Sequence, residues 1–206
     1  MVRHGVALDS KTFIRRAAFL AFGTFGIFVM FSYFGRFGEN FDAWEAMQQS
    51  KVFFLIRQSW REGADVECWY IAVIDRDENN HIILSRMGSF IPRTTLYNKH
   101  FKYTIIERDW DGTRSIMRVS LQRYNNVTVL KYKMVYRDEE GCIILKITGV
   151  SPESVAGRIG ECEMWASKES APRLSANSLC EVRYNELGCG TKKMPYGNSC
   201  TDPLAS

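Results

Sequence analysis

Cysteine is the residue whose number and placement promise the most chemistry in this chain. Five of the six cysteines follow residue 140, and the last three, Cys180, Cys189 and Cys200, are spread through a polar tail. An even number of cysteines downstream of an export signal indicates a disulfide framework. Spacing alone allows fifteen pairings of six cysteines. The residues therefore predict cross-links without predicting which cysteines pair.

Catalytic and metal-binding chemistry is not indicated by the other reactive side chains. Neither cysteine nor aspartate stands at metal-ligand spacing from His4, His81 or His100. A catalytic site needs a nucleophile, a base and an orienting group that converge, and no serine lies in a motif that supplies them. We therefore expect no enzyme activity, no metal site and no cofactor.

The export signal is an apolar stretch at residues 17–34, which carries no charge and follows a pair of arginines. A basic start, an apolar centre of modest length and glycines at the exit are typical of a secretory signal peptide. We predict a signal peptide over residues 1–38 and a single secreted domain over residues 39–206. Because Tyr33 and Arg36 are bulky where a cleavage site favours small side chains, an uncleaved membrane anchor stays open as an alternative.

The positive charge of the chain belongs to the predicted signal peptide. That segment holds five of the 27 Lys and Arg residues and one of the 23 Asp and Glu residues, which leaves 22 of each. Affinity for nucleic acid comes from clustered positive charge. We therefore expect the neutral domain to bind neither nucleic acid nor a membrane after signal removal, and to be a monomer with room for one core.

The middle of the chain predicts consecutive antiparallel strands, because short runs rich in Val, Ile, Tyr and Phe alternate with polar turns. In one run Leu130, Tyr132, Met134 and Tyr136 are expected on one face, with lysines on the other. The eight predicted strands cover residues 52–58, 66–74, 81–89, 101–107, 114–121, 127–136, 142–148 and 162–167. Eight strands in up-and-down order favour a closed barrel, which removes exposed edges and can enclose one small ligand.

Two helices are predicted, one before the strands in the sequence and one after them. The first covers residues 40–49 and is capped by Asn40 or Asp42. The second covers residues 173–187 and ends at Gly188. Its predicted face holds Ala176, Leu179, Cys180, Arg183 and Leu187. We expect this helix to lie outside the barrel and to be held there through Cys180.

Short motifs in a defined order carry a family resemblance over about residue 40 to Cys200. These motifs are Asp42-Ala43-Trp44, Tyr136-Arg137-Asp138 just ahead of Cys142, and Cys162-Glu163-Met164-Trp165 before a cysteine-bearing helix. The chain resembles the tick salivary lipocalins of the histamine-binding type. The resemblance implies a mainly β protein, an eight-stranded lipocalin barrel with a C-terminal helix packed outside. It also implies a protein of tick saliva that sequesters a small host mediator and helps to evade host inflammatory defence.

Disulfide pairing and one packing role follow from the resemblance. It implies bonds from Cys68 to Cys200 and from Cys142 to Cys180, with Cys162 and Cys189 left for each other. Removal of any one bond from a small secreted domain is expected to cost about 2–5 kcal/mol. In lipocalins generally a tryptophan near the start plugs the closed end of the barrel, a role that Trp44 would take.

The ligand that the resemblance implies is a biogenic amine such as histamine or serotonin. A buried amine needs carboxylates and aromatic faces to offset its lost hydration. Glu163 would hold the ammonium group, with Trp165 as its cation–π partner. The other candidate ligand-binding residues are Trp60, Tyr132, Leu130 and Ile143.

The acids that amine-binding relatives carry are mostly missing here. The position after the seventh-strand cysteine, which is acidic in those relatives, holds Ile143. By approximate alignment, further acidic positions fall on Gly63, Thr104 and Tyr132. On this alignment, Glu163 is the one carboxylate of the usual set that remains.

An apolar lipid mediator, such as a fatty acid or a leukotriene, is therefore the alternative ligand. Its tail would contact an apolar wall. That expected wall is Phe54, Ile56, Trp69, Ile71, Ile105, Leu130, Tyr132, Met134 and Leu145. Arg57, Arg114 or Arg118 is a candidate partner for its carboxylate, and the sequence leaves open whether these arginines point inward or outward.

Binding of a protein partner through the outer surface is a further alternative. A disulfide-rich protease inhibitor within residues 162–200 is a third class, although the cysteine spacings there do not match a Kunitz-type framework. Asn126 begins an Asn-Val-Thr acceptor for N-glycosylation, which is typical of an exposed loop in a secreted glycoprotein.

Overall fold

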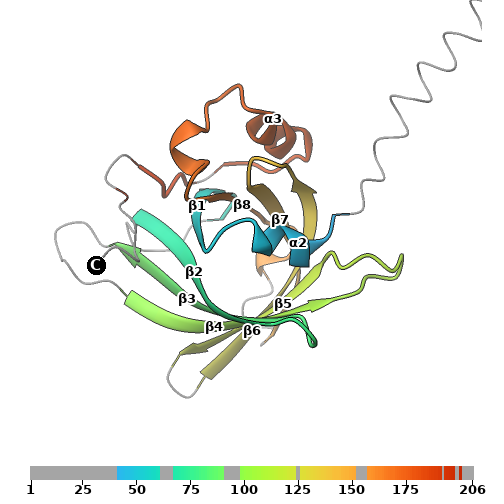
Figure 1. The fold of residues 1–206 in the computed structure, drawn as a ribbon. Helices are drawn as coiled ribbons and strands as arrows, with labels where there is room; N and C mark the ends of the chain where they lie inside the picture. Colours follow the sequence, from blue (N-terminus) through green and yellow to red (C-terminus); the bar gives the residue numbers. More distant parts are fainter. Residues whose placement is uncertain are drawn as a thin grey trace, which may run out of the picture. The chain divides into compact units, whose positions relative to one another are not determined.

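Eight antiparallel strands pair in chain order, and the last pairs with the first, so the sheet closes into a barrel (Figure 1). The strands are β1 (Val52–Gln58), β2 (Glu67–Asp77), β3 (Ile82–Phe90), β4 (Asn98–Glu107), β5 (Ile116–Arg123), β6 (Asn126–Arg137), β7 (Cys142–Ser151) and β8 (Cys162–Ser167). Helix α2 (Ala43–Gln48) precedes them, and the 3-10 turn η3 (Ala171–Arg173) and helix α3 (Leu179–Glu186) follow. The predicted fold class is confirmed.

The structure is a computed structural model that describes residues 41–60, 67–90, 98–123, 126–151, 157–191, 193–197 and 200. The predicted signal peptide and Gly63 lie outside these residues, as does the side chain of Asn126, whose backbone opens β6. No helix within the described ranges is both long and apolar enough to cross a membrane.

Helix α2 fills one end of the barrel. Asp42 caps it by accepting hydrogen bonds from the backbone N–H groups of Trp44, at 2.9 Å, and Glu45, at 3.2 Å. Trp44 and Met47 lie one helical turn apart and are both buried in the barrel core. The plugging role expected of Trp44 therefore fits its position.

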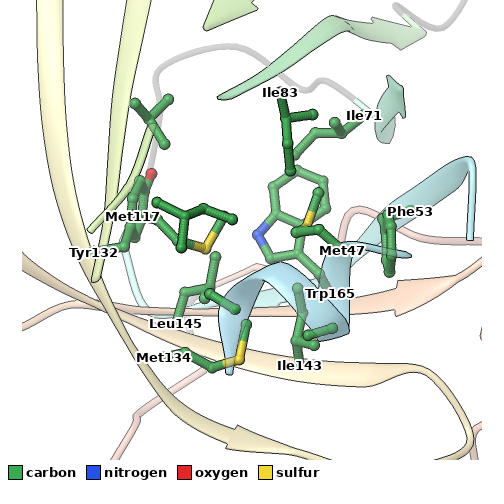
Figure 2. Packing of buried hydrophobic residues seen from close by; sticks show 14 of the residues in the cluster. Met47, Phe53, Ile71, Ile83, Met117, Tyr132, Met134, Ile143, Leu145 and Trp165 are labelled. Atoms are coloured by element: carbon green, nitrogen blue, oxygen red, sulfur yellow. The ribbon is translucent and has the colours of Figure 1, made fainter. Parts of the chain in front are cut away.

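The core around this plug is made by alternate, inward-pointing residues of the strands. Figure 2 shows Phe53, Ile71, Ile83, Met117, Met134 and Ile143 converging on it. Ile83 is fully buried and Ile143 is 2 % exposed. This end of the barrel is packed solid.

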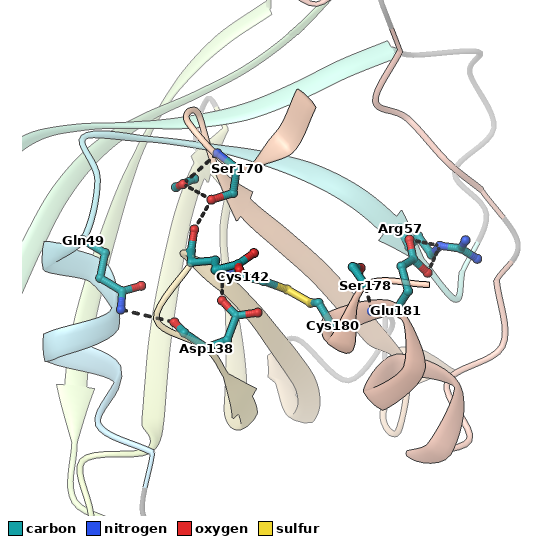
Figure 3. Close-up of a disulfide and its surroundings, with 10 residues drawn as sticks. Gln49, Arg57, Asp138, Cys142, Ser170, Ser178, Cys180 and Glu181 are labelled. Carbon is teal, nitrogen blue, oxygen red and sulfur yellow. Dashed lines mark hydrogen bonds and ion pairs between the residues drawn. A yellow bond between two sulfur atoms is a disulfide. The ribbon is translucent and has the colours of Figure 1, made fainter. Parts of the chain in front are cut away.

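A second apolar cluster covers the outside of β1, β7 and β8. Helix α3 packs on this side, where Cys180 and Tyr184 join Ile144 and Met164 (Figure 1). The pairs that the family resemblance implies, Cys68–Cys200, Cys142–Cys180 and Cys162–Cys189, are all disulfides in the structure. The second of them fastens α3 to the start of β7, as Figure 3 shows.

One register shift, and the choice of inward face in two further strands, move outside some side chains that the sequence analysis had placed inside. In β6 a shift between Met134 and Tyr136 turns Tyr136 into the outer cluster, so the predicted four-residue inner face ends at Met134. Phe54 and Ile56 of β1 also belong to the outer cluster. In β4 the core residue is Ile106 and not the predicted Ile105.

The second predicted helix is shorter than expected and buries a different face. The predicted residues 173–187 contain the end of η3, a non-helical link and then α3, which starts at Leu179 because Ser178 caps it by accepting from the N–H of Glu181. The buried residues of α3 are Cys180, Glu181 and Tyr184, whereas Leu179 and Leu187 are exposed.

Candidate ligand-binding site

The barrel end opposite α2 is hollow. A cavity of about 170 Å³ lies there, far more than one water molecule needs. Its apolar walls include Leu55, Trp69, Met87, Val119, Leu121 and Leu130, each from an inward position of its strand. Trp165 borders both the cavity and the packed core, so it forms the floor between the two.

Glu163 is a buried carboxylate in the cavity wall. It lies two residues before Trp165 on β8, so both side chains point into the barrel. The Tyr132 hydroxyl donates to Oε1 at 3.0 Å, and the Trp165 indole N–H donates to Oε2 at 2.9 Å. Burial raises the pKa of Glu163, against the lowering effects of Lys102 and these two hydrogen bonds.

Lys102 is a buried cation in the same cavity, and sequence reasoning missed it. The residue is 5 % exposed, and Nζ lies 5.9 Å from the centroid of the Trp165 ring. Burial lowers the pKa of Lys102 to about 8, while Glu163 acts in the opposite direction. Among the described residues, no carboxylate oxygen lies within 4.0 Å of the Lys102 ammonium, so Lys102 forms no ion pair with them.

The orientation of β4 explains why Lys102 was missed. Its neighbours Phe101 and Tyr103 are 57 % and 48 % exposed, whereas Lys102 and Thr104 are buried. Apolar side chains thus point to solvent and polar ones into the barrel, the reverse of the usual pattern. The alternation along β4 was the available signal, since it puts Lys102 and Thr104 on one face of the strand, and that face is the inward one.

Trp60 and Arg158 complete the polar part of the wall. The Arg158 guanidinium lies 4.0 Å from the centroid of the Trp60 ring, within cation–π range. The Trp60 indole N–H is buried and has no hydrogen-bond acceptor within the part of the chain that the structure describes. Both residues line the cavity.

The structure brings together five of the six candidate ligand-binding residues. The cavity wall holds Glu163, Trp165, Trp60, Tyr132 and Leu130. Ile143 lies instead in the packed core near the α2 plug. The sequence prediction had grouped it with the others because of its position after Cys142 and not because of its depth along the barrel.

The three arginines considered for a lipid carboxylate pair with carboxylates of the protein. Arg57 bonds to Glu181 of α3 at 2.7 Å, as Figure 3 shows. Arg114 contacts the helix cap Asp42 at 2.6 Å, and Arg118 contacts Glu107 at 2.7 Å. None of the three is in the wall of the described cavity, where the cations are Lys102 and Arg158.

A protein-family model described as tick histamine binding protein matches residues 36–202. The chain belongs to this family. No curated protein matches it significantly. Membership confirms the resemblance drawn from the short motifs, and the family's name describes a binding protein. A hollow barrel agrees with binding of a small molecule in this tick family.

Proposed function

We propose that the protein is a secreted lipocalin that captures one small host mediator inside its barrel and so helps to evade host inflammatory defence. The observation that carries the proposal is the cavity, which is walled by apolar and aromatic side chains and floored by Trp165. Such pockets, with a few convergent polar groups, are typical ligand sites. The three disulfides fit an oxidising, extracellular environment. Capture is stoichiometric, so affinity and abundance decide its effect.

A biogenic amine such as histamine or serotonin is one candidate ligand, supported by Glu163. The carboxylate is buried beside the Trp165 ring, and its oxygens accept hydrogen bonds from Tyr132 and Trp165, which leaves further acceptor capacity. An ammonium group at this position would gain both an ionic and a cation–π contact.

A lipid mediator such as a fatty acid or leukotriene is the other candidate, supported by Lys102. The Lys102 ammonium already lies near the Trp165 ring, where a ligand amine would be expected. A cationic ligand close to the Trp165 ring would therefore meet the like charge of Lys102, whereas the carboxylate of an apolar acid would gain an opposite charge there. The apolar walls suit an aliphatic tail.

The cavity itself is tested by filling it. Leu121 lines the cavity on β5, and Leu121→Trp should lower affinity for every cavity ligand by about tenfold or more. Calorimetric titration of histamine, serotonin, arachidonate and a leukotriene into wild type and variant measures this effect. Lys131→Trp, at an exposed position on β6, is the matched control and should bind like the wild type. Ligand binding that Leu121→Trp leaves unchanged would place the ligand elsewhere.

A further inference from the structure

We propose that the hollow end of the barrel carries an anion subsite, formed by the Lys102 ammonium, the Trp60 indole N–H and the Arg158 guanidinium, for the carboxylate of an amphipathic monocarboxylic acid. All three residues line the cavity. The inference rests on the proposed function, because it assigns the chemical class of the captured molecule.

The charges of the cavity wall favour an anion. In the described wall, Lys102 and Arg158 are positive and Glu163 alone is negative. Lys102 is nearly fully buried, yet it forms no ion pair with the described carboxylates. A buried cation is stabilised by a close counter-ion, and a ligand carboxylate would supply one.

The hydrogen-bond donors of the wall lead to the same chemical class. The Trp60 N–H is buried without an acceptor among the described residues, and an indole nitrogen donates only. A ligand that accepts hydrogen bonds would satisfy this group, whereas an ammonium group would not. Carboxylate oxygens accept from both N–H and ammonium donors.

Glu163 has a positioning role in this arrangement. Its oxygens accept from Tyr132 and Trp165, which fixes both rings in the wall. Its negative charge also favours the charged form of Lys102. Glu163 thus keeps the cation available without forming an ion pair with it.

The apolar part of the cavity selects the rest of the ligand. Met87, Val119, Leu121 and Leu130 are apolar, and the Thr128 hydroxyl is a further polar side-chain group of the described wall besides those already named. The ligand class that fits both parts is a molecule with one carboxylate and an apolar body.

Octanoate and its methyl ester, which has the same chain without the charge, are the test ligands for calorimetry, because a short chain matches a cavity of about 170 Å³. The acid should bind the wild type about tenfold or more tightly than the ester, as expected for a charge-assisted hydrogen bond. Lys102→Met keeps most of the length of the side chain and removes the charge. It should remove most of this preference and leave ester binding unchanged, while the exposed Lys131→Met keeps the wild-type preference.

Titration at several pH values is a second measurement that needs no variant. Affinity for the acid should be nearly constant from about pH 6 to pH 7, where the ligand carboxylate is ionised, and fall as the pH rises through about 8, because Lys102 loses its proton there. Affinity for the ester should not follow this curve.

The other outcomes overturn one proposal or both. Equal binding of acid and ester, or an unchanged preference in Lys102→Met, overturns the anion subsite. Binding of serotonin without the acid, lost in Glu163→Gln, also overturns it but leaves the proposed capture of a small mediator standing. Absence of binding by every ligand of the panel overturns both.

Discussion

Two opposite charges at residue scale give the cavity its character. Lys102 and Glu163 are each 5 % exposed, and each favours the charged form of the other without direct contact between them. Burial alone would drive both groups toward neutrality. Both side chains line the cavity, so a polar ligand group that enters it meets both charges.

Because Lys102 is buried, we expect the stability of the protein to rise as the pH increases above about 8. The pKa of Lys102 is lowered to about 8 in the folded protein, so the unfolded chain binds more protons between pH 8 and 10. The free energy of unfolding should therefore rise across this range, by on the order of 1–3 kcal/mol relative to Lys102→Met. Urea denaturation at several pH values measures it. Parallel curves for the two proteins would contradict a buried, titrating lysine, and Lys131→Met should match the wild type.

At the scale of elements, α3 is held by specific links more than by an apolar face. Its buried residues are Cys180, Glu181 and Tyr184, of which Glu181 pairs with Arg57 and Cys180 with Cys142 (Figure 3). Burial raises the pKa of the Tyr184 hydroxyl. Because α3 lies outside the barrel, the helix and the cavity are separate parts of the fold.

Removal of the Cys142–Cys180 bond should therefore loosen α3 without emptying the cavity. The double variant Cys142→Ala, Cys180→Ala is expected to lose about 2–5 kcal/mol of stability. Relative to the wild type, amide hydrogen exchange should speed up more in α3 than in β4, because the helix loses its covalent anchor. Ligand affinity at 10 °C, where the fold persists, should stay within a few-fold of wild type. Unchanged protection of α3 amides would show that packing alone holds the helix.

For the whole barrel, we expect the filled end to contribute most of the stability and the hollow end to bind the ligand. The end that contains Trp44 and Met47 is filled, and the end lined by Leu121 and Leu130 is not. A part-exposed wall residue such as Leu121 can therefore change with less loss of core packing than a residue of the filled end. The solid end keeps the barrel closed.

A matched pair of isomeric side chains tests this division. Ile143→Ala in the packed core should cost about 2–5 kcal/mol, because it leaves a new cavity. Leu121 is part-exposed and already borders a cavity, so Leu121→Ala should lower the free energy of unfolding by only about 1 kcal/mol. Equal losses in urea denaturation would show that the cavity end is as tightly packed as the other. Ligand affinity should change only in Leu121→Ala, which also tests the earlier prediction that Ile143 binds the ligand.

Patterns along the chain were sufficient for much of this protein. The strand runs predicted all eight strands, and those at 52–58 and 162–167 have the predicted bounds. Alternation over such runs is a local property, so no partner is needed to recognise it. The motif around Glu163 and Trp165 likewise placed both residues on one face of a strand, where the structure has them.

Only the tertiary structure decided which face of each strand is inside and what lies opposite what. Lys102 lies inside and Phe101 outside, contrary to their polarity, because closure of the barrel sets the inward face of β4. The shift that turns Tyr136 outward depends on pairing with β7, a contact between strands that no window of sequence contains. The meeting of Lys102, Trp60 and Arg158 in one cavity joins a strand and two loops far apart in the chain, so it exists only in the folded barrel.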